Sequence, residues 1–150
     1  MKPERPDTPV ELKVRALRLL TQREHSRAEL TRKLAPHAES PQALEALLTE
    51  LAQRRQLSDE RYAEARTHWL ARKYGAAKIR QDLKAHGVAD AVVDRVSSDG
   101  DLEKAKAILA RKYRAPATTR EEKAKRMRFL QSRGFSYDTI RSVLRVDDSE

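Results

Sequence analysis

Apolar residues recur along most of the chain at intervals of three and four, the spacing that places them on one face of an α-helix. Leu44, Leu47, Leu48 and Leu51 are one clear case. No segment alternates apolar and polar residues over the length of a strand. The pattern predicts helices near residues 10–23, 27–36, 41–55, 59–73, 76–86, 89–97, 101–113, 120–133 and 137–145.

Residues that cap helix N-termini precede many of these segments. Thr8 supplies a hydroxyl, Pro9 suits the first helical position, and Glu11 can reach back to the cap amide, as in a capping box. Caps at this density predict many short helices. The other expected caps are Ser26 with Glu29, Ser40 before Pro41, Thr119 with Glu122, and the simpler Ser58, Asp99 and Ser136.

One arrangement of leucine and isoleucine occurs three times. Leu20, Leu70 and Leu130 each lie near the end of a predicted helix, and each precedes a tight turn and a helix with apolar residues at i and i+4. The nine helices then form three groups, residues 10–57, 58–98 and 99–146, between a flexible N-terminus (1–9) and an acidic tail (147–150).

A three-helix group of this size buries little alone and gains its core by stacking on its neighbours. The predicted fold class is therefore all-α, with tandem three-helix repeats in a curved, elongated array. The alternative is a generic helical bundle in which the leucine spacing arises by chance.

The composition agrees with helices and adds a strong basic excess. Of the 150 residues 39% are hydrophobic and 37% charged, which suits helices with thin apolar stripes and wide solvated faces. The net charge is +9, and its local balance is +3 in residues 1–57, +1 in 58–100 and +8 in 101–146. The last of these segments is the strongest candidate for binding a polyanion, of which nucleic acid is the expected one.

Several functional classes are excluded. The chain has no cysteine, which removes disulfides, thiolate zinc sites and cysteine nucleophiles. The four glycines form no phosphate-binding loop, and the four histidines lack metal-ligand spacing. No apolar run approaches the ~20 residues of a membrane span, and the N-terminus has no apolar signal segment. We expect a cytoplasmic, monomeric protein that is not an enzyme and holds no cofactor or metal.

Some of the basic residues follow the repeat. Arg80 and Lys84 each lie one position after an apolar residue of the second repeat, and Arg141 and Arg145 do the same in the third. Because residues four apart share a helix face, each pair is expected beside the buried stripe, on the same flank. The alternative is that these side chains only cover the stripe with their methylene stems. Other cations extend the two patches: Arg72, Lys73 and Lys78 in the second repeat, and Lys123, Lys125, Arg126, Arg128 and Arg133 in the third.

The aromatic residues are expected to pack rather than to stack on bases. Those on or beside apolar arcs, assigned to the core, are Tyr62, Trp69, Phe129 and Tyr137, whereas Tyr74 and Phe135 lie in turns and are candidates for exposure.

Three stretches occur in an order that resembles a known family: REHSRAEL at 23–30, LSDERYA at 57–63 and RFLQSRGFS at 128–136. Together they resemble the RecX regulatory proteins, modulators of the RecA recombinase, and the match covers roughly residues 10–146. The resemblance implies an all-helical protein of three tandem three-helix repeats. It also implies binding to RecA and to its filament on single-stranded DNA, with inhibition of ATP hydrolysis, strand exchange and coprotease activity. It implies no catalytic residue.

The residues and the resemblance combine in one expectation. A helical array docks in the groove of the RecA–DNA filament, contacts more than one protomer, and blocks growth or favours loss of protomers. Its cations face acidic RecA surface, the backbone of single- or double-stranded DNA, or both. Two alternatives stay open. One is a DNA-binding module that acts independently of RecA, since a tight-turn helix pair also resembles a helix-turn-helix. The other is a scaffold for another acidic protein.

Overall fold

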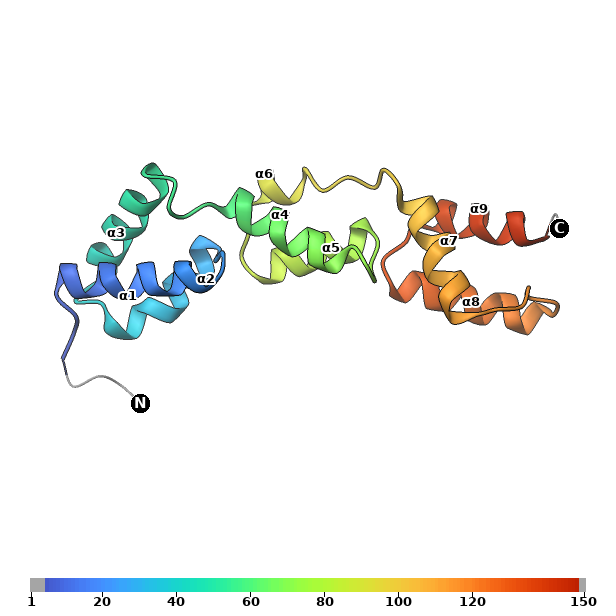
Figure 1. Cartoon of the computed structure of the whole chain (residues 1–150), viewed down its shortest axis with the longest axis horizontal. Helices are drawn as coiled ribbons and strands as arrows, with labels where there is room; N and C mark the ends of the chain where they lie inside the picture. The colour runs from blue at the N-terminus through green and yellow to red at the C-terminus, as the bar shows by residue number, and fades with distance from the viewer. Residues whose placement is uncertain (1–4, 149–150) are drawn as a thin grey trace. The chain divides into compact units, whose positions relative to one another are not determined.

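The computed structural model describes residues 5–148, with side chains through residue 145, so the side chains of the expected acidic tail lie outside the described part. This part contains nine α-helices and no strand (Figure 1). The helices are α1 (Pro9–Gln22), α2 (Arg27–Leu34), α3 (Pro41–Gln53), α4 (Asp59–Leu70), α5 (Ala76–Ala85), α6 (Asp90–Val93), α7 (Asp101–Lys112), α8 (Arg120–Ser132) and α9 (Tyr137–Asp148), with a 3-10 turn, η1 (Ala35–His37), after α2.

The chain divides into two compact units. Unit 1 comprises Met1–Arg66 and Leu83–Val93, and unit 2 comprises Thr67–Asp82 and Asp94–Glu150, so that α4 and α5 contribute to both. The buried core of unit 1 is Leu12, Ala16, Leu30, Leu34, Leu44, Leu47, Leu48, Leu51 and Leu57. That of unit 2 is Ala105, Ile108, Leu109, Leu130, Phe135, Ile140, Val143 and Leu144.

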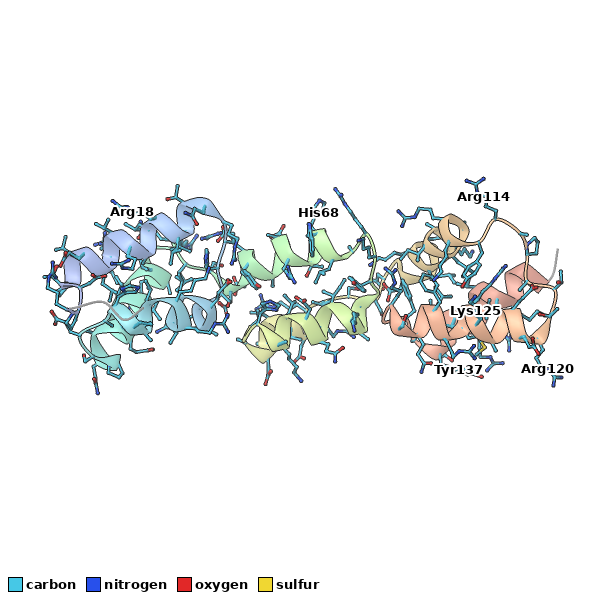
Figure 2. All side chains as sticks on the ribbon, turned by 90° about the horizontal axis from the view of Figure 1, so that it is seen from below. Arg18, His68, Arg114, Arg120, Lys125 and Tyr137 are labelled. Carbon is cyan, nitrogen blue, oxygen red and sulfur yellow. The ribbon has the colours of Figure 1, made fainter. Side chains whose placement is uncertain are left out.

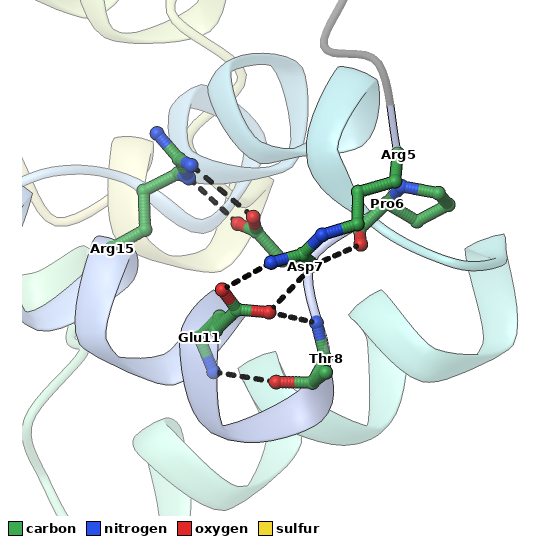
Figure 3. A network of polar contacts seen from close by, with 6 residues as sticks. All are labelled: Arg5, Pro6, Asp7, Thr8, Glu11 and Arg15. Atoms are coloured by element: carbon green, nitrogen blue, oxygen red, sulfur yellow. Dashed lines mark hydrogen bonds and ion pairs between the residues drawn. The ribbon is translucent and has the colours of Figure 1, made fainter.

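The cap predicted for α1 is confirmed. Thr8 Oγ1 accepts the Glu11 N–H at 3.2 Å and Glu11 Oε1 accepts the Thr8 N–H at 3.0 Å, which completes the capping box (Figure 3). Arg5 donates to both Glu11 carboxylate oxygens, at 2.8 and 3.0 Å. These bonds, first from Arg5 and then from Thr8, lower the pKa of Glu11 from 4.5 to about 2. The caps by Ser26, Ser40, Ser58, Thr119 and Ser136 are confirmed as well.

Three details of the predicted helix starts differ. Glu29 accepts hydrogen bonds from Arg23, and Glu122 accepts the Thr118 N–H at 2.9 Å, so these two carboxylates are used outside the expected boxes. The cap by Asp99 is wrong. Gly100 precedes α7 with a φ of 81° and no side-chain cap bond.

The helix expected over residues 89–97 covers only Asp90–Val93. The residues that follow, 94–100, include two serines, two aspartates and a glycine, which compete with helix formation. The carbonyl of Val96 accepts two hydrogen bonds from the Arg80 guanidinium, at 3.1 and 2.5 Å, and so has a partner outside a helix.

An aspartate at the start of one group of three helices caps the second helix of the group before it, once in each unit. In unit 1, Asp59 Oδ1, at the first residue of α4, accepts the Arg27 N–H of α2 at 2.8 Å. In unit 2, Asp101 Oδ2, at the first residue of α7, accepts the Ala76 N–H of α5 at 3.1 Å. These carboxylates satisfy N–H groups that a helix leaves unpaired at its start.

Two turns that contain glycine pack against the N-termini of α2 and α5, the helices that the two aspartates cap. A Cβ added to Gly87, after α5, would lie 2.4 Å from Ala28 Cβ on α2. A Cβ added to Gly134, after α8, would lie 2.4 Å from Lys78 Cβ on α5. The backbone therefore approaches the neighbouring helix more closely than any side chain at these positions permits.

Main-chain carbonyls next to Gly87 and Gly134 form hydrogen bonds beside the same two helix starts. The carbonyl of His86 accepts a hydrogen bond from Ser26 Oγ at 3.0 Å, and that of Arg133 accepts one from the Gly75 N–H at 2.7 Å. The turn after α8 therefore contacts the start of α5 as the turn after α5 contacts the start of α2. By these contacts α8, like α5, is the second helix of its group.

The register expected for the third repeat is therefore wrong by one helix. The leucine pattern matched α8 and α9 with α4 and α5, whereas the contacts match α8 with α5. The leucine spacing placed the turns that contain Gly75 and Gly134 in equivalent positions. Gly75 precedes a helix, whereas Gly134 follows one with a φ of 89°. The cation pairs of α5 and α9 consequently do not occupy equivalent positions.

Candidate polyanion-binding surface

The twelve cations expected at the site divide by exposure. Arg126 is only 7% exposed. Arg80, Lys123 and Arg133 are half-buried. The other eight side chains are exposed and form no ion pair within residues 5–145: Arg72, Lys73, Lys78, Lys84, Lys125, Arg128, Arg141 and Arg145.

Arg126 differs from its expected role on the surface. Its Nη2 donates to the Ala115 carbonyl at 2.7 Å, and its guanidinium lies 4.4 Å from the Tyr113 ring centroid. The side chain thus fastens the loop after α7 to α8. Because it is buried and engaged, we exclude Arg126 from the binding surface.

Three other cations bind the turn that follows α4. The consecutive carbonyls of residues 72, 73 and 74 accept hydrogen bonds from Arg111 at 3.1 Å, Arg133 at 3.3 Å and Lys104 at 3.2 Å. These carbonyls follow the last residue of α4, Leu70, and positive charge near the C-terminus of a helix is favoured by the helix dipole. Arg133 also lies over the Tyr74 and Phe129 rings, at 5.5 and 5.1 Å from their centroids. Part of the basic excess therefore stabilises unit 2.

The exposed cations of unit 2 include two pairs on adjacent packed helices. Lys125 and Arg128 lie three residues apart on α8, and Arg141 and Arg145 lie four apart on α9, so each pair shares a helix face. Figure 2 shows Lys125 on α8 and Tyr137 at the start of α9. Residues 120–145 contain eight cations and three acidic residues, which leaves this segment strongly positive.

An aromatic ring extends the α9 pair. Tyr137 is 62% exposed, and the Arg141 guanidinium lies 5.5 Å from its ring centroid. Tyr137, Arg141 and Arg145 are spaced by four and form one face of α9, which we call the α9 strip. An exposed ring beside cations suits a strand of unstacked bases with a charged backbone.

The expected roles of several aromatics are wrong. Tyr137 and Trp69, assigned to the core, are 62% and 64% exposed, whereas Phe135, expected at the surface, is 4% exposed and belongs to the core of unit 2. The N–H of Phe135 bonds to the Leu130 carbonyl in the turn after α8, which directs its ring inward. Helical spacing alone does not reveal that Tyr137, in the first turn of α9, is exposed while Ile140 in the same turn is buried.

Other kinds of site find no support within residues 5–148. No three His, Asp or Glu side chains form a group suited to a metal ion, and no helix is long and apolar enough to cross a bilayer. The arrangement can offer positive charge, hydrogen-bond donors and one aromatic face to a partner.

Family models account for most of the chain. The first, second and third three-helix domains of RecX match residues 13–51, 58–96 and 99–144 in turn. The chain belongs to the RecX family. The matched segments place α4–α6 in the second domain and α7–α9 in the third, in agreement with the register found from the domain contacts.

Relatives in the RecX family match over nearly the full length. The regulatory protein RecX of Herbaspirillum seropedicae is 45% identical over 144 residues, 94% of each chain. That of Leptothrix cholodnii is 46% identical over 142 residues, 93% of this chain and 90% of its own. The crystal structure of RecX from Lactobacillus salivarius has the same fold, with a TM-score of 0.83 at 21% identity over 95% of this chain and 97% of that one.

Proposed function

We propose that this chain regulates the RecA recombinase. It binds RecA and the RecA filament on single-stranded DNA, and it inhibits ATP hydrolysis, strand exchange and coprotease activity by docking in the filament groove. The bound protein limits filament extension or promotes disassembly. It acts as a monomer in the cytoplasm and needs no cofactor.

One observation supports this proposal above the others. A member of the RecX family presents, on α8 and α9, four exposed cations without ion-pair partners in the described part and one exposed aromatic ring. A filament offers the same surface repeatedly, so several weak contacts add up through effective concentration.

Direct contact with DNA is part of the same proposal. Cations attract phosphate regardless of sequence, and an exposed tyrosine stacks on any base. The α9 strip therefore suits the single strand inside the filament. A module that binds DNA independently of RecA would use the same strip, which makes it the second candidate.

The test is reversal of the α9 pair, Arg141→Glu with Arg145→Glu. The matched control reverses two exposed cations of unit 1 that have no ion pair in the described residues, Arg18→Glu with Arg32→Glu. Both variants change the net charge equally, and their helical circular dichroism should equal that of the wild type.

We expect the α9 variant to inhibit RecA-dependent ATP hydrolysis at least about tenfold more weakly, and to bind an oligothymidine with a shallower salt dependence. The unit 1 variant should stay near the wild type in both assays. Undiminished inhibition by the α9 variant would remove the strip from the mechanism. Wild-type protein that binds the oligothymidine but leaves RecA activity unchanged would favour the independent DNA-binding module.

A further inference from the structure

Unit 1 has an apolar groove between α1 and α3. Its volume is about 360 Å³, near the lower end of the ~300–1,000 Å³ typical of ligand pockets. Buried Leu12 and Leu47 form its floor, and Pro9, Val10, Ala43 and Ala46 line its sides. These dimensions suit one or two apolar side chains better than an extended cofactor.

The apolar surface continues outside the groove along α1. Val10 is 73% exposed and Val14, one turn later on the same face, is 44% exposed. Single exposed apolar residues are common on protein surfaces. Two adjoining valines beside an apolar groove form a continuous patch, which is typical of a site for another macromolecule.

The rim of the groove contains charged residues, most of which are paired. Its charged residues are three carboxylates, Asp7, Glu39 and Glu50, and one ammonium, that of Lys13. The Lys13 ammonium binds Glu50 Oε1 at 3.1 Å, and Arg54 Nη2 lies 3.5 Å from the same oxygen. Helix α3, which supplies one wall, contains two glutamates and no lysine or arginine. Both glutamates are paired with cations, Glu45 with Arg27 and Glu50 with Lys13 and Arg54, so the rim carboxylate that no ion pair among the described residues neutralises is Glu39.

Two of the rim carboxylates, Asp7 and Glu39, differ in whether they are free to bind a cation of a partner. Asp7 is buried and bound by Arg15, whose Nε lies 2.7 Å from Oδ2 (Figure 3). That hydrogen bond lowers the pKa of Asp7, so the group remains ionised but already has a partner. Glu39 is exposed and has no ion pair among the described residues. A cation on a bound partner would meet Glu39 first.

We propose that the groove docks a protein segment that inserts an apolar side chain between α1 and α3 and places an adjacent lysine or arginine against Glu39. This combination follows from the apolar lining and from Glu39, which is unpaired within the described residues, because an apolar anchor beside an unpaired carboxylate favours a partner with a cation at that place. On the function proposed above, the segment belongs to RecA. Unit 1 then recognises protein while the α9 strip contacts nucleic acid.

The first experiment separates the two surfaces. In the groove variant, Glu39→Lys with Ala46→Lys, one change reverses the rim charge and the other obstructs the groove. The matched control, Glu64→Lys with Ala65→Lys, makes the same replacements on α4. All four positions are exposed, so both proteins should fold.

Affinities are measured for purified RecA without DNA and, separately, for an oligothymidine without RecA. We expect the groove variant to bind RecA at least about tenfold more weakly and the oligothymidine no more weakly than the wild type. The control should stay within about twofold of the wild type for RecA. Equal RecA affinities for the groove variant and the control would overturn the proposal.

A second probe tests the groove if wild-type protein does not bind RecA, an outcome that refutes the proposed function. A synthetic helix of leucine and lysine is compared with one of leucine and glutamate by amide chemical shifts. The leucine–lysine helix should shift the amides of Val10 and Ala46, and the leucine–glutamate helix should not. Equal shifts with both peptides, or none with either, would refute the groove as a docking site for apolar, basic segments.

Discussion

Replacing Gly134 by alanine should destabilise the protein more than the same replacement at Gly100. Both residues have left-handed backbone, with φ of 89° and 81°. An L-residue in this conformation costs about 1–2 kcal/mol, so both variants lose that amount. The comparison removes backbone strain from the result and leaves the effect of the surroundings.

The surroundings of the two glycines differ completely. A Cβ at Gly134 would lie 2.4 Å from Lys78 Cβ and 2.6 Å from Lys78 N, whereas a Cβ at Gly100 has no atom within 4 Å. Overpacking of this kind costs about 1–3 kcal/mol. Gly134→Ala should therefore lose about 2–5 kcal/mol of unfolding free energy, and Gly100→Ala about 1–2 kcal/mol.

Urea unfolding followed by far-ultraviolet circular dichroism measures the difference between the two variants. Adding Lys78→Ala to the Gly134 variant should not restore stability, because the close atoms are the Cβ and the main chain, which alanine retains. Equal unfolding free energies for the two glycine variants would show that the turn after α8 does not press against α5 in solution.

Three further predictions concern single side chains. Because its pKa is about 2 instead of 4.5, Glu11 should stabilise the fold fully above pH 4.5 and lose this contribution as the pH falls toward 2. In thermal unfolding over that range the wild type should lose more stability than Glu11→Gln, and parallel curves would contradict the capping network. Asp101→Ala should leave the Ala76 N–H without its acceptor and cost about 1–3 kcal/mol, and hydrogen exchange at Ala76 should accelerate; unchanged exchange would argue against the cap. Tyr137→Ala should weaken oligothymidine binding by about 1–3 kcal/mol in fluorescence anisotropy, while Tyr137→Phe retains the wild-type affinity. Equal affinities of Tyr137→Ala and the wild type would exclude stacking.

Much of the fold was predictable because helix starts depend on local sequence. A hydroxyl two or three residues before a free N–H caps that helix whatever surrounds it, as Thr8 and Ser40 do. The end of α3 shows the limit of this reasoning. Arg55 adopts a φ of 60° there, where glycine is the usual residue, so no sequence signal marked the turn.

Contacts across domain boundaries could not be predicted. Asp59 and Asp101 begin their own helices, and nothing in the local sequence shows that their carboxylates cap helices 32 and 25 residues earlier. Only packing decides this, and it also decided the register of the third domain. The leucine spacing is present in the sequence, but it matched α8 and α9 with α4 and α5, which are at different positions in the order of helices within their domains.

The candidate site was predicted in composition but not in detail. Charge balance located the C-terminal third, and most of the chosen cations are exposed. Burial of Arg126 and the engagement of Arg80 with Val96 depend on a nearby ring or carbonyl that spacing does not reveal. Tyr137 was missed because its position on the apolar arc of the predicted helix suggested that its ring is buried. In the described structure no helix covers the ring, which is 62% exposed.

The cross-domain bonds mean that the first and second three-helix domains are each completed by the domain that follows. A chain that stopped after residue 98 would lack Asp101, the Arg133 carbonyl and the three cations that bind the turn after α4. Loss of these contacts would destabilise α4 and α5, which lie before the cut. Limited proteolysis would then cleave α4 and α5 at sites that are protected in the full chain. Shortening this protein by one domain thus removes more order than the missing residues themselves supply.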